Sequence, residues 1–171
     1  GSEMCIRDSS DSFRMKLSFL PNGNCVILPN INGRGYGFFK ITEGESSGLW
    51  SVLRSSEDEV LKGSLLITLY ENLRWKTISP QGFREEMLAY LPNESNSLLF
   101  SMALSYLGDC QRIFPSDSCP LEEALWKIVT TNPVSQHRLQ AFRLYRSIAD
   151  SEEAVQRLYT LWQERKAPKD C

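Results

Sequence analysis

The hydrophobic pattern of this chain changes its period once, near Glu43, and this change constrains the fold more than any other feature. Before Glu43, apolar residues alternate with polar ones, which is the period of a half-buried β-strand. After Glu43, apolar residues recur at spacings of three and four, as they do on one face of an α-helix. The chain is therefore predicted to contain a short strand-rich part followed only by helices.

Three antiparallel strands are expected in the strand-rich part. Residues 13–20 alternate between apolar and polar side chains, and the pair Asn22-Gly23 then suits a tight hairpin turn before residues 25–28. Residues 36–41 form the third extended segment. Three strands alone make a marginal sheet with exposed edges, so these strands are expected to complete a larger β-sandwich domain.

Six or seven helices with one apolar stripe each, joined by short loops, are expected after Glu43. Ser79 and Pro80 mark one helix start, whereas Pro92 and the Asn132-Pro133 pair mark breaks. Residues 60–70 are apolar almost all round and predict a helix buried between neighbours. The predicted fold class is mainly α, an irregular HEAT- or armadillo-like stack of antiparallel helix pairs preceded by the small β segment.

The chain divides into three expected parts. Residues 1–11 lack any periodicity and look like a tag or an adaptor sequence, so we expect them to be disordered. Residues 12–42 hold the strands, and residues 43–171 form the helical-repeat domain. A helical stack needs a polar capping helix, and the last residues do not supply one, so we expect this domain to be truncated at its C-terminus.

Composition excludes several classes of function. The 171 residues are 42% apolar, enough for a core, and the net charge of −2 provides no broad field for phosphate backbones or acidic membranes. No apolar run approaches the roughly 18 to 20 residues that span a bilayer, and no signal peptide is recognisable. We therefore expect a soluble protein without a nucleic-acid or membrane partner, and the choice between cytoplasm and periplasm stays open.

The nucleophilic and metal-binding side chains show no catalytic pattern. His137 is the only histidine and lacks partners at metal-ligand spacing, so it is expected to face solvent on a helix. The five cysteines also lack such spacing, and free thiols are the simplest interpretation. Two weaker alternatives stay open, namely a bridge between Cys110 and Cys119 and a thiol enzyme that uses one of these two residues.

Three further groups of residues have a structural interpretation and a functional one. Residues 33–37 are rich in glycine but precede a strand, which favours a tight connection over a phosphate-binding loop. Three acidic pairs are each expected in the first turn of a helix, where they offset the helix dipole: Glu85 and Glu86, Glu122 and Glu123, Glu152 and Glu153. Four arginines are expected on a solvated face paired with Glu152 and Glu153, although a basic strip that holds a peptide carboxylate is an alternative: Arg138, Arg143, Arg146 and Arg157.

The order of the segments resembles a known family. The segments are the strand residues Leu28-Pro29-Asn30 through Gly35-Tyr36-Gly37-Phe38-Phe39, then Leu49-Trp50, then a long buried helix over residues 59–75. This order is similar to the C-terminal part of aminopeptidase N-like zinc metallopeptidases, the gluzincins, in which a small β-sandwich precedes a helical-repeat domain. The resemblance covers about residues 13–166.

The resemblance implies a division of labour. In such enzymes a separate catalytic domain carries His-Glu-x-x-His with a downstream Glu for zinc, and Gly-x-Met-Glu-Asn for the substrate amine. This sequence contains neither motif, so no catalytic, cofactor-binding or metal-binding residue is assigned to it, and zinc is expected only in the missing catalytic domain. The family's helical domain caps the catalytic cleft, and some members supply a basic residue near the C-terminal end of the peptide substrate.

Two alternative functions are therefore expected. The first is a non-catalytic C-terminal fragment of a zinc aminopeptidase, which caps the catalytic domain of the same polypeptide and restricts access of peptide substrates. The alternative is a free-standing α-helical solenoid scaffold for protein–protein interaction. The unpaired strands favour the first function, because a complete scaffold would not begin with half of a sandwich.

Overall fold

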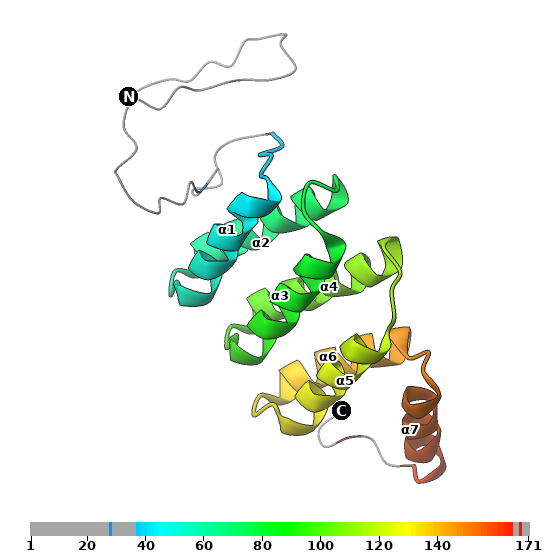
Figure 1. Cartoon of the computed structure of the whole chain (residues 1–171). Coiled ribbons are helices and arrows are strands. Elements are labelled where there is room, and N and C mark those ends of the chain that lie inside the picture. Colours follow the sequence, from blue (N-terminus) through cyan, green and yellow to red (C-terminus); the bar gives the residue numbers. More distant parts are fainter. Residues whose placement is uncertain (1–27, 29–36, 166–167, 169–171) are drawn as a thin grey trace, which may run out of the picture.

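The structure is a computed structural model that describes residues 28, 37–165 and 168 of the chain. The described part is mainly helical, as the sequence predicts, and its elements follow in the order α1 (Glu43–Ser55), α2 (Glu59–Arg74), α3 (Pro80–Tyr90), the 3₁₀ turn η1 (Leu91–Asn93), α4 (Ser97–Ile113), α5 (Cys119–Thr131), α6 (Ser135–Ile148) and α7 (Glu152–Gln163) (Figure 1). The expected strands lie almost wholly outside the described residues. Leu28 and residues 37–42, which are described, belong to no strand.

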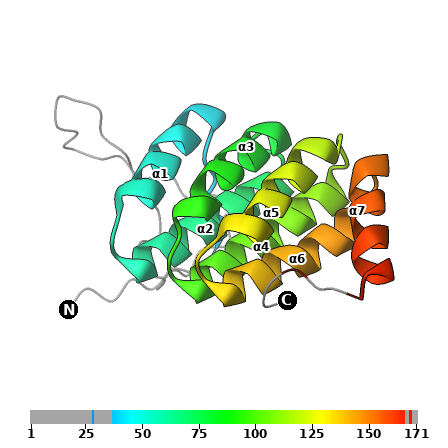
Figure 2. The same ribbon diagram turned by 90° about the horizontal axis from the view of Figure 1, so that it is seen from below.

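The first six helices are arranged in two layers. Helices α1, α3 and α5 lie side by side in one layer, and α2, α4 and α6 lie side by side in the other (Figures 1 and 2). Consecutive helices pack together as α1 with α2, α3 with α4, and α5 with α6, while α4 also packs against α2 and α6. Helix α7 lies at the end of this stack, beyond α5 and α6.

The helix starts follow from local side-chain caps. Thr42 and Glu45 form a capping box at α1, and the side chain of Asp58 accepts hydrogen bonds from the N–H groups of Val60 and Leu61 in the first turn of α2. Ser79 accepts from the N–H of Gly82, 3.2 Å away, and Pro80 follows it at the first helical position, as the sequence predicts. These caps satisfy backbone donors that the helices leave unpaired.

The core lies between the two layers and is built from leucine and aromatic side chains. Leu66, Leu69 and Leu73 of α2 are completely buried. The opposite side of α2 is different, because Val60 is 73% exposed and Ile67 is 45% exposed. The predicted position between neighbours is found, because α2 packs against α1, α3 and α4, but the exposed Val60 and Ile67 show that the helix is not buried on every side.

Helices α4 and α6 approach closely at Gly108. A Cβ atom at this position would lie 2.8 Å from Cδ1 of Leu144, which is shorter than normal van der Waals contact. The missing side chain lets the two helices pack closely there, and it helps to place α6 within the stack.

Candidate protein-interaction surface

Helix α7 is anchored to the stack at its N-terminus. Oε1 of Glu122, in α5, accepts hydrogen bonds from the N–H groups of Asp150 and Ser151 at 2.8 and 3.2 Å, and Oε2 accepts from the Ser151 hydroxyl. The Ser151 oxygen in turn accepts from the N–H of Ala154 at 3.1 Å and caps the helix. Ala154 is buried at this end, so the first turn of α7 is held firmly.

Arg157 provides a second anchor one turn further along α7. Its guanidinium donates to Glu123 of α5 at 2.7 Å and to Glu153 of its own helix, and it lies 5.6 Å from the ring centre of Trp126. The hydrogen bond to Glu123 is the largest cause that raises the pKa of Arg157. This arginine is therefore used to join α7 to α5.

One side of α7 carries a stripe of exposed apolar residues. Val155, Tyr159 and Trp162 are spaced at i, i+4 and i+7 and are 51%, 48% and 72% exposed. The rings of Tyr159 and Trp162 lie 5.8 Å apart. Within residues 37–165 no other helix covers this stripe, so α7 presents a continuous apolar edge at the end of the stack.

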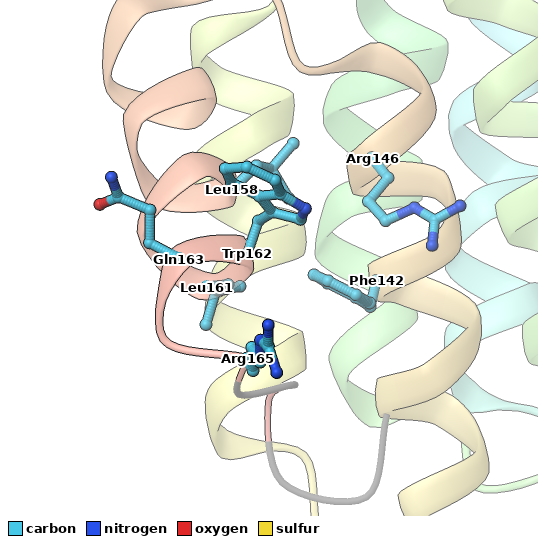
Figure 3. Close-up of a pocket in the computed structure, with 7 residues that line it drawn as sticks. All are labelled: Phe142, Arg146, Leu158, Leu161, Trp162, Gln163 and Arg165. Carbon is cyan, nitrogen blue, oxygen red and sulfur yellow. The ribbon is translucent and has the colours of Figure 1, made fainter.

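A hollow of about 970 Å³ lies next to this stripe, between α6 and α7; we call it the α6–α7 groove (Figure 3). Leu158 and Trp162 of α7 face Phe142 and Arg146 of α6 across it. Its lining is Phe142, Arg146, Leu158, Leu161, Trp162, Gln163 and Arg165.

The charge of the α6–α7 groove is positive. The guanidinium of Arg146 lies 6.0 Å from the ring centre of Phe142, and Arg165 stands at the end of α7. The lining residues include no carboxylate, and within the described part neither arginine forms an ion pair. The groove therefore combines apolar and aromatic walls with two available positive charges, a composition typical of protein-binding surfaces.

His137 does not face solvent, and this prediction is wrong. Its imidazole is buried, stacks on the ring of Phe100 at a centroid distance of 3.9 Å, and has Nε2 3.1 Å from the Ser97 hydroxyl. Its Nδ1 atom has no hydrogen-bond partner. The reason is helical spacing, because His137 shares a face with the buried residues Ala141 and Tyr145 at i+4 and i+8.

Neither of the two described thiols has a lowered pKa, although the Arg84 guanidinium lies 3.5 Å from the sulfur of Cys110 and acts to lower its pKa. Cys110 is buried and Cys119 is exposed, and both are free, so the structure contains no bridge between them. Burial raises the pKa of Cys110, and a hydrogen bond to Asp117 raises the pKa of Cys119. A nucleophilic cysteine has a lowered pKa, so these two thiols give the thiol-enzyme alternative no support. The glycine-rich residues 33–36 lie outside the described residues.

The four arginines have separate roles rather than one shared face. Arg157 pairs with Glu153, as expected, but also with Glu123, and Arg138 donates to the carbonyl of Asn132 at 2.7 Å. Arg146 lines the α6–α7 groove, and Arg143 is exposed on the same helix.

The acidic pairs also differ in part from the expectation. Glu122, Glu152 and Glu153 lie in first helical turns as predicted, but Glu123, Glu85 and Glu86 do not, because α5 already begins at Cys119 and α3 at Pro80. Glu86 instead pairs with Arg54 of α1, and Glu85 accepts from the side chain of Gln81 at 2.9 Å.

The most deeply buried of the ion pairs among the described residues also joins helices. Glu94, only 4% exposed, accepts from Lys62 of α2 at 2.7 Å, from the N–H of Asn96 at 2.7 Å and from the hydroxyl of Tyr90. Burial acts to raise the pKa of Glu94, but these hydrogen bonds outweigh it, and the pKa is lowered. The carboxylate is thus a satisfied structural acceptor between α2 and η1.

Among the described side chains, no group of three or more histidines, cysteines, aspartates or glutamates is placed to hold a metal ion. The described helices likewise include none with the length and hydropathy needed to cross a bilayer. Comparison with known proteins adds no relative: no protein-family model, no curated protein and no solved structure matches this chain. The α6–α7 groove and the apolar stripe beside it are therefore the candidate site that the structure offers.

Proposed function

We propose that the helices form a HEAT- or armadillo-type stack with a non-catalytic role, in which the end of the stack docks on a protein surface. The observation that carries this proposal is the uncovered apolar edge of α7, formed by Val155, Tyr159 and Trp162 beside the α6–α7 groove. Large contiguous apolar patches are unusual on soluble monomers and commonly mark interaction sites. Tryptophan, tyrosine and arginine, all found here, are also enriched among residues that dominate binding energy.

The partner that the family resemblance implies is the catalytic domain of a zinc aminopeptidase on the same polypeptide. We propose that the helical stack caps the cleft of that domain and restricts entry to short or unfolded peptides. The polar side chains that hold the described helices together support a structural role, because Glu94, Glu122 and Arg157 are all engaged between helices. The described residues do not fit a zinc site, so no step of this proposal involves a metal held by this chain.

A free-standing helical scaffold is the second candidate. The same exposed stripe on α7 favours it, because an apolar edge with two arginines beside it would serve a separate partner equally well. The two candidates differ in whether the partner is covalently joined to the helices.

The full reading frame of the gene tests the first candidate. We expect it to encode His-Glu-x-x-His upstream of these helices and to yield a polypeptide that hydrolyses an aminoacyl p-nitroanilide until a zinc chelator is added. Removal of residues 43–165 should leave cleavage of this small substrate measurable and increase relative cleavage of long peptides, if the deleted protein remains soluble. A reading frame without the zinc motif, or a full polypeptide without chelator-sensitive activity, would leave the scaffold as the better candidate.

A further inference from the structure

The complete helix pairs show where the second helix of a pair belongs. Helix α4 packs against its own partner α3 and against α2 of the preceding pair, and α6 packs in the same way against α5 and α4. Each even-numbered helix after α2 therefore occupies the angle between its odd-numbered partner and the preceding even-numbered helix (Figure 2).

Helix α7 is an odd-numbered helix whose equivalent position is open within the described part of the chain. By the same rule, a helix paired with α7 would lie between α7 and α6. This is the location of the α6–α7 groove, where Leu158 and Trp162 face Phe142 (Figure 3). The groove thus has both the position and the apolar lining of a seat for one more helix.

We infer that the α6–α7 groove binds a single amphipathic α-helix of the partner protein, with acidic residues beside its apolar stripe. This inference rests on the proposed docking function and specifies its site and its partner. Helix-in-groove recognition places apolar anchors at i, i+3 or i+4, and i+7 against a hydrophobic groove. Here the anchors would contact Phe142, Leu158 and Trp162, and the acidic residues would pair with Arg146 and Arg165.

The charge and the packing of α7 favour such a helix over a second copy of this chain. The groove has two arginines and no carboxylate, so it complements an acidic helix rather than a neutral one. The α7 helix of a second copy is already held by its own α5 through Glu122 and Arg157. It is therefore not free to enter the groove as a separate helix.

Fluorescence of Trp162 provides the test in the 171-residue chain. A Trp75→Phe background removes the other strongly exposed indole, which does not line the groove. Two synthetic peptides of about 18 residues, enough for five helical turns, share one leucine stripe flanked by glutamates in the first and by lysines in the second. We expect the glutamate peptide to shift the Trp162 emission and to bind at least tenfold more tightly than the lysine peptide.

Charge reversal supplies the matched variants. Arg146→Glu combined with Arg165→Glu should reverse the preference, so that the lysine peptide binds more tightly. Arg143→Glu, an equal change at an exposed arginine of α6 outside the groove, should leave the original preference in place.

Equal binding of the two peptides, or binding of neither, would overturn the inference. Self-association of the chain in sedimentation experiments, if Trp162→Glu abolished it, would also overturn the inference. The occupant of the groove would then be a second copy of the chain. Failure of the aminopeptidase proposal is separate, since it appears as a missing zinc motif in the reading frame. The glutamate peptide would still bind the groove in that case.

Discussion

Glu122 in α5 caps α7 from another helix, because its carboxylate accepts both the backbone N–H and the hydroxyl of Ser151, 29 residues further along the chain. In a capping box, the side chain that accepts the backbone N–H of the cap residue belongs to the third residue of the capped helix. In α7 that residue is Ala154, which has no side-chain acceptor. The position of α7, and with it the α6–α7 groove, therefore depends on a contact between helices.

Glu122→Ala tests this contact. Glu122 is 1% exposed, and its removal leaves the N–H groups of Asp150 and Ser151 without their acceptor. Hydrogen bonds to a charged group contribute about 1.5 to 3 kcal/mol. We therefore expect the free energy of unfolding, measured by urea denaturation, to fall by about 2 to 3 kcal/mol.

Glu123→Ala is the matched control for that variant. Glu123 is the adjacent acid, its side chain is 57% exposed, and its interaction is an ion pair with Arg157. Exposed ion pairs contribute at most about 1 kcal/mol, so the free energy of unfolding of this variant should lie within about 1 kcal/mol of the parent value. Equal losses for the two variants would show that Glu122 has no special role in holding α7.

Asn72→Ala should lower the free energy of unfolding by a similar amount at the other end of the stack. Asn72 is completely buried, and its amide donates to the carbonyls of Phe39 and Thr68 and accepts from the N–H of Ile41 and the hydroxyl of Thr77. Each buried polar group left without a partner costs about 1 to 3 kcal/mol. We expect a loss of about 2 to 4 kcal/mol in urea denaturation and faster hydrogen exchange at the Ile41 amide.

Asn93→Ala serves as the control for Asn72. Asn93 is exposed, and its single side-chain bond, to the carbonyl of Ala89, is 3.3 Å long. Exposed substitutions of this kind usually change stability by less than about 0.5 kcal/mol. If the two alanine variants lost the same stability, the buried bonds of Asn72 would not be what holds residues 39–41 against α2.

The helices could be predicted from the sequence because their signals are local. Ser79 and Pro80 mark the start of α3 through a cap that involves residues a few positions apart. His137 shows the limit of this approach. The spacing of His137 from Ala141 and Tyr145 places it on the apolar face of its helix, but a lone polar side chain is ordinarily expected on the solvent side. Its burial against Phe100 depends on how α4 and α6 pack, which the sequence pattern does not describe.

The α6–α7 groove could not be predicted for the same reason. Arg146 and Trp162 lie on different helices, and no spacing rule relates them. Their relative placement follows from the bond between Glu122 and Ser151 and from the close approach of α4 and α6 at Gly108. Both are contacts between residues distant in the sequence, which hydrophobic period and capping rules do not describe.

A pair of glycine variants tests the close approach of α4 and α6. Gly63→Ala in the interior of α2 meets only ordinary van der Waals contact, with Leu99 Cδ2 at 3.7 Å, and should stabilise the protein by about 0.5 to 1 kcal/mol, because alanine favours the helix. Gly108→Ala has the same helical advantage but must displace Leu144, and overpacking of this kind costs about 1 kcal/mol or more. We expect no gain at Gly108 in thermal or urea unfolding, and equal gains at both positions would contradict the packing described here.

The buried imidazole of His137 should make stability depend on pH. Burial lowers the pKa of His137 from its ordinary value of 6.5, and Glu94 opposes this only in part. The unfolded chain therefore binds a proton at a higher pH than the folded protein does. The contribution of this group to stability should be complete above about pH 6.5 and should be lost as the pH falls from there through the lowered pKa.

His137→Phe isolates this effect from the acidic groups. Phenylalanine keeps a ring against Phe100, and Ser97, which is only partly buried, can turn its hydroxyl to water. Glu94 and Glu122 have pKa values below their ordinary 4.5, so they lose their contributions only in a more acidic range. Urea denaturation between about pH 7.5 and 5.5 should show falling stability for the parent chain and a nearly level profile for the variant. If stability fell in parallel with pH for the parent chain and the variant, His137 would not be the group that titrates. Protonation or hydration of its Nδ1 atom would then leave the free energy of unfolding unchanged.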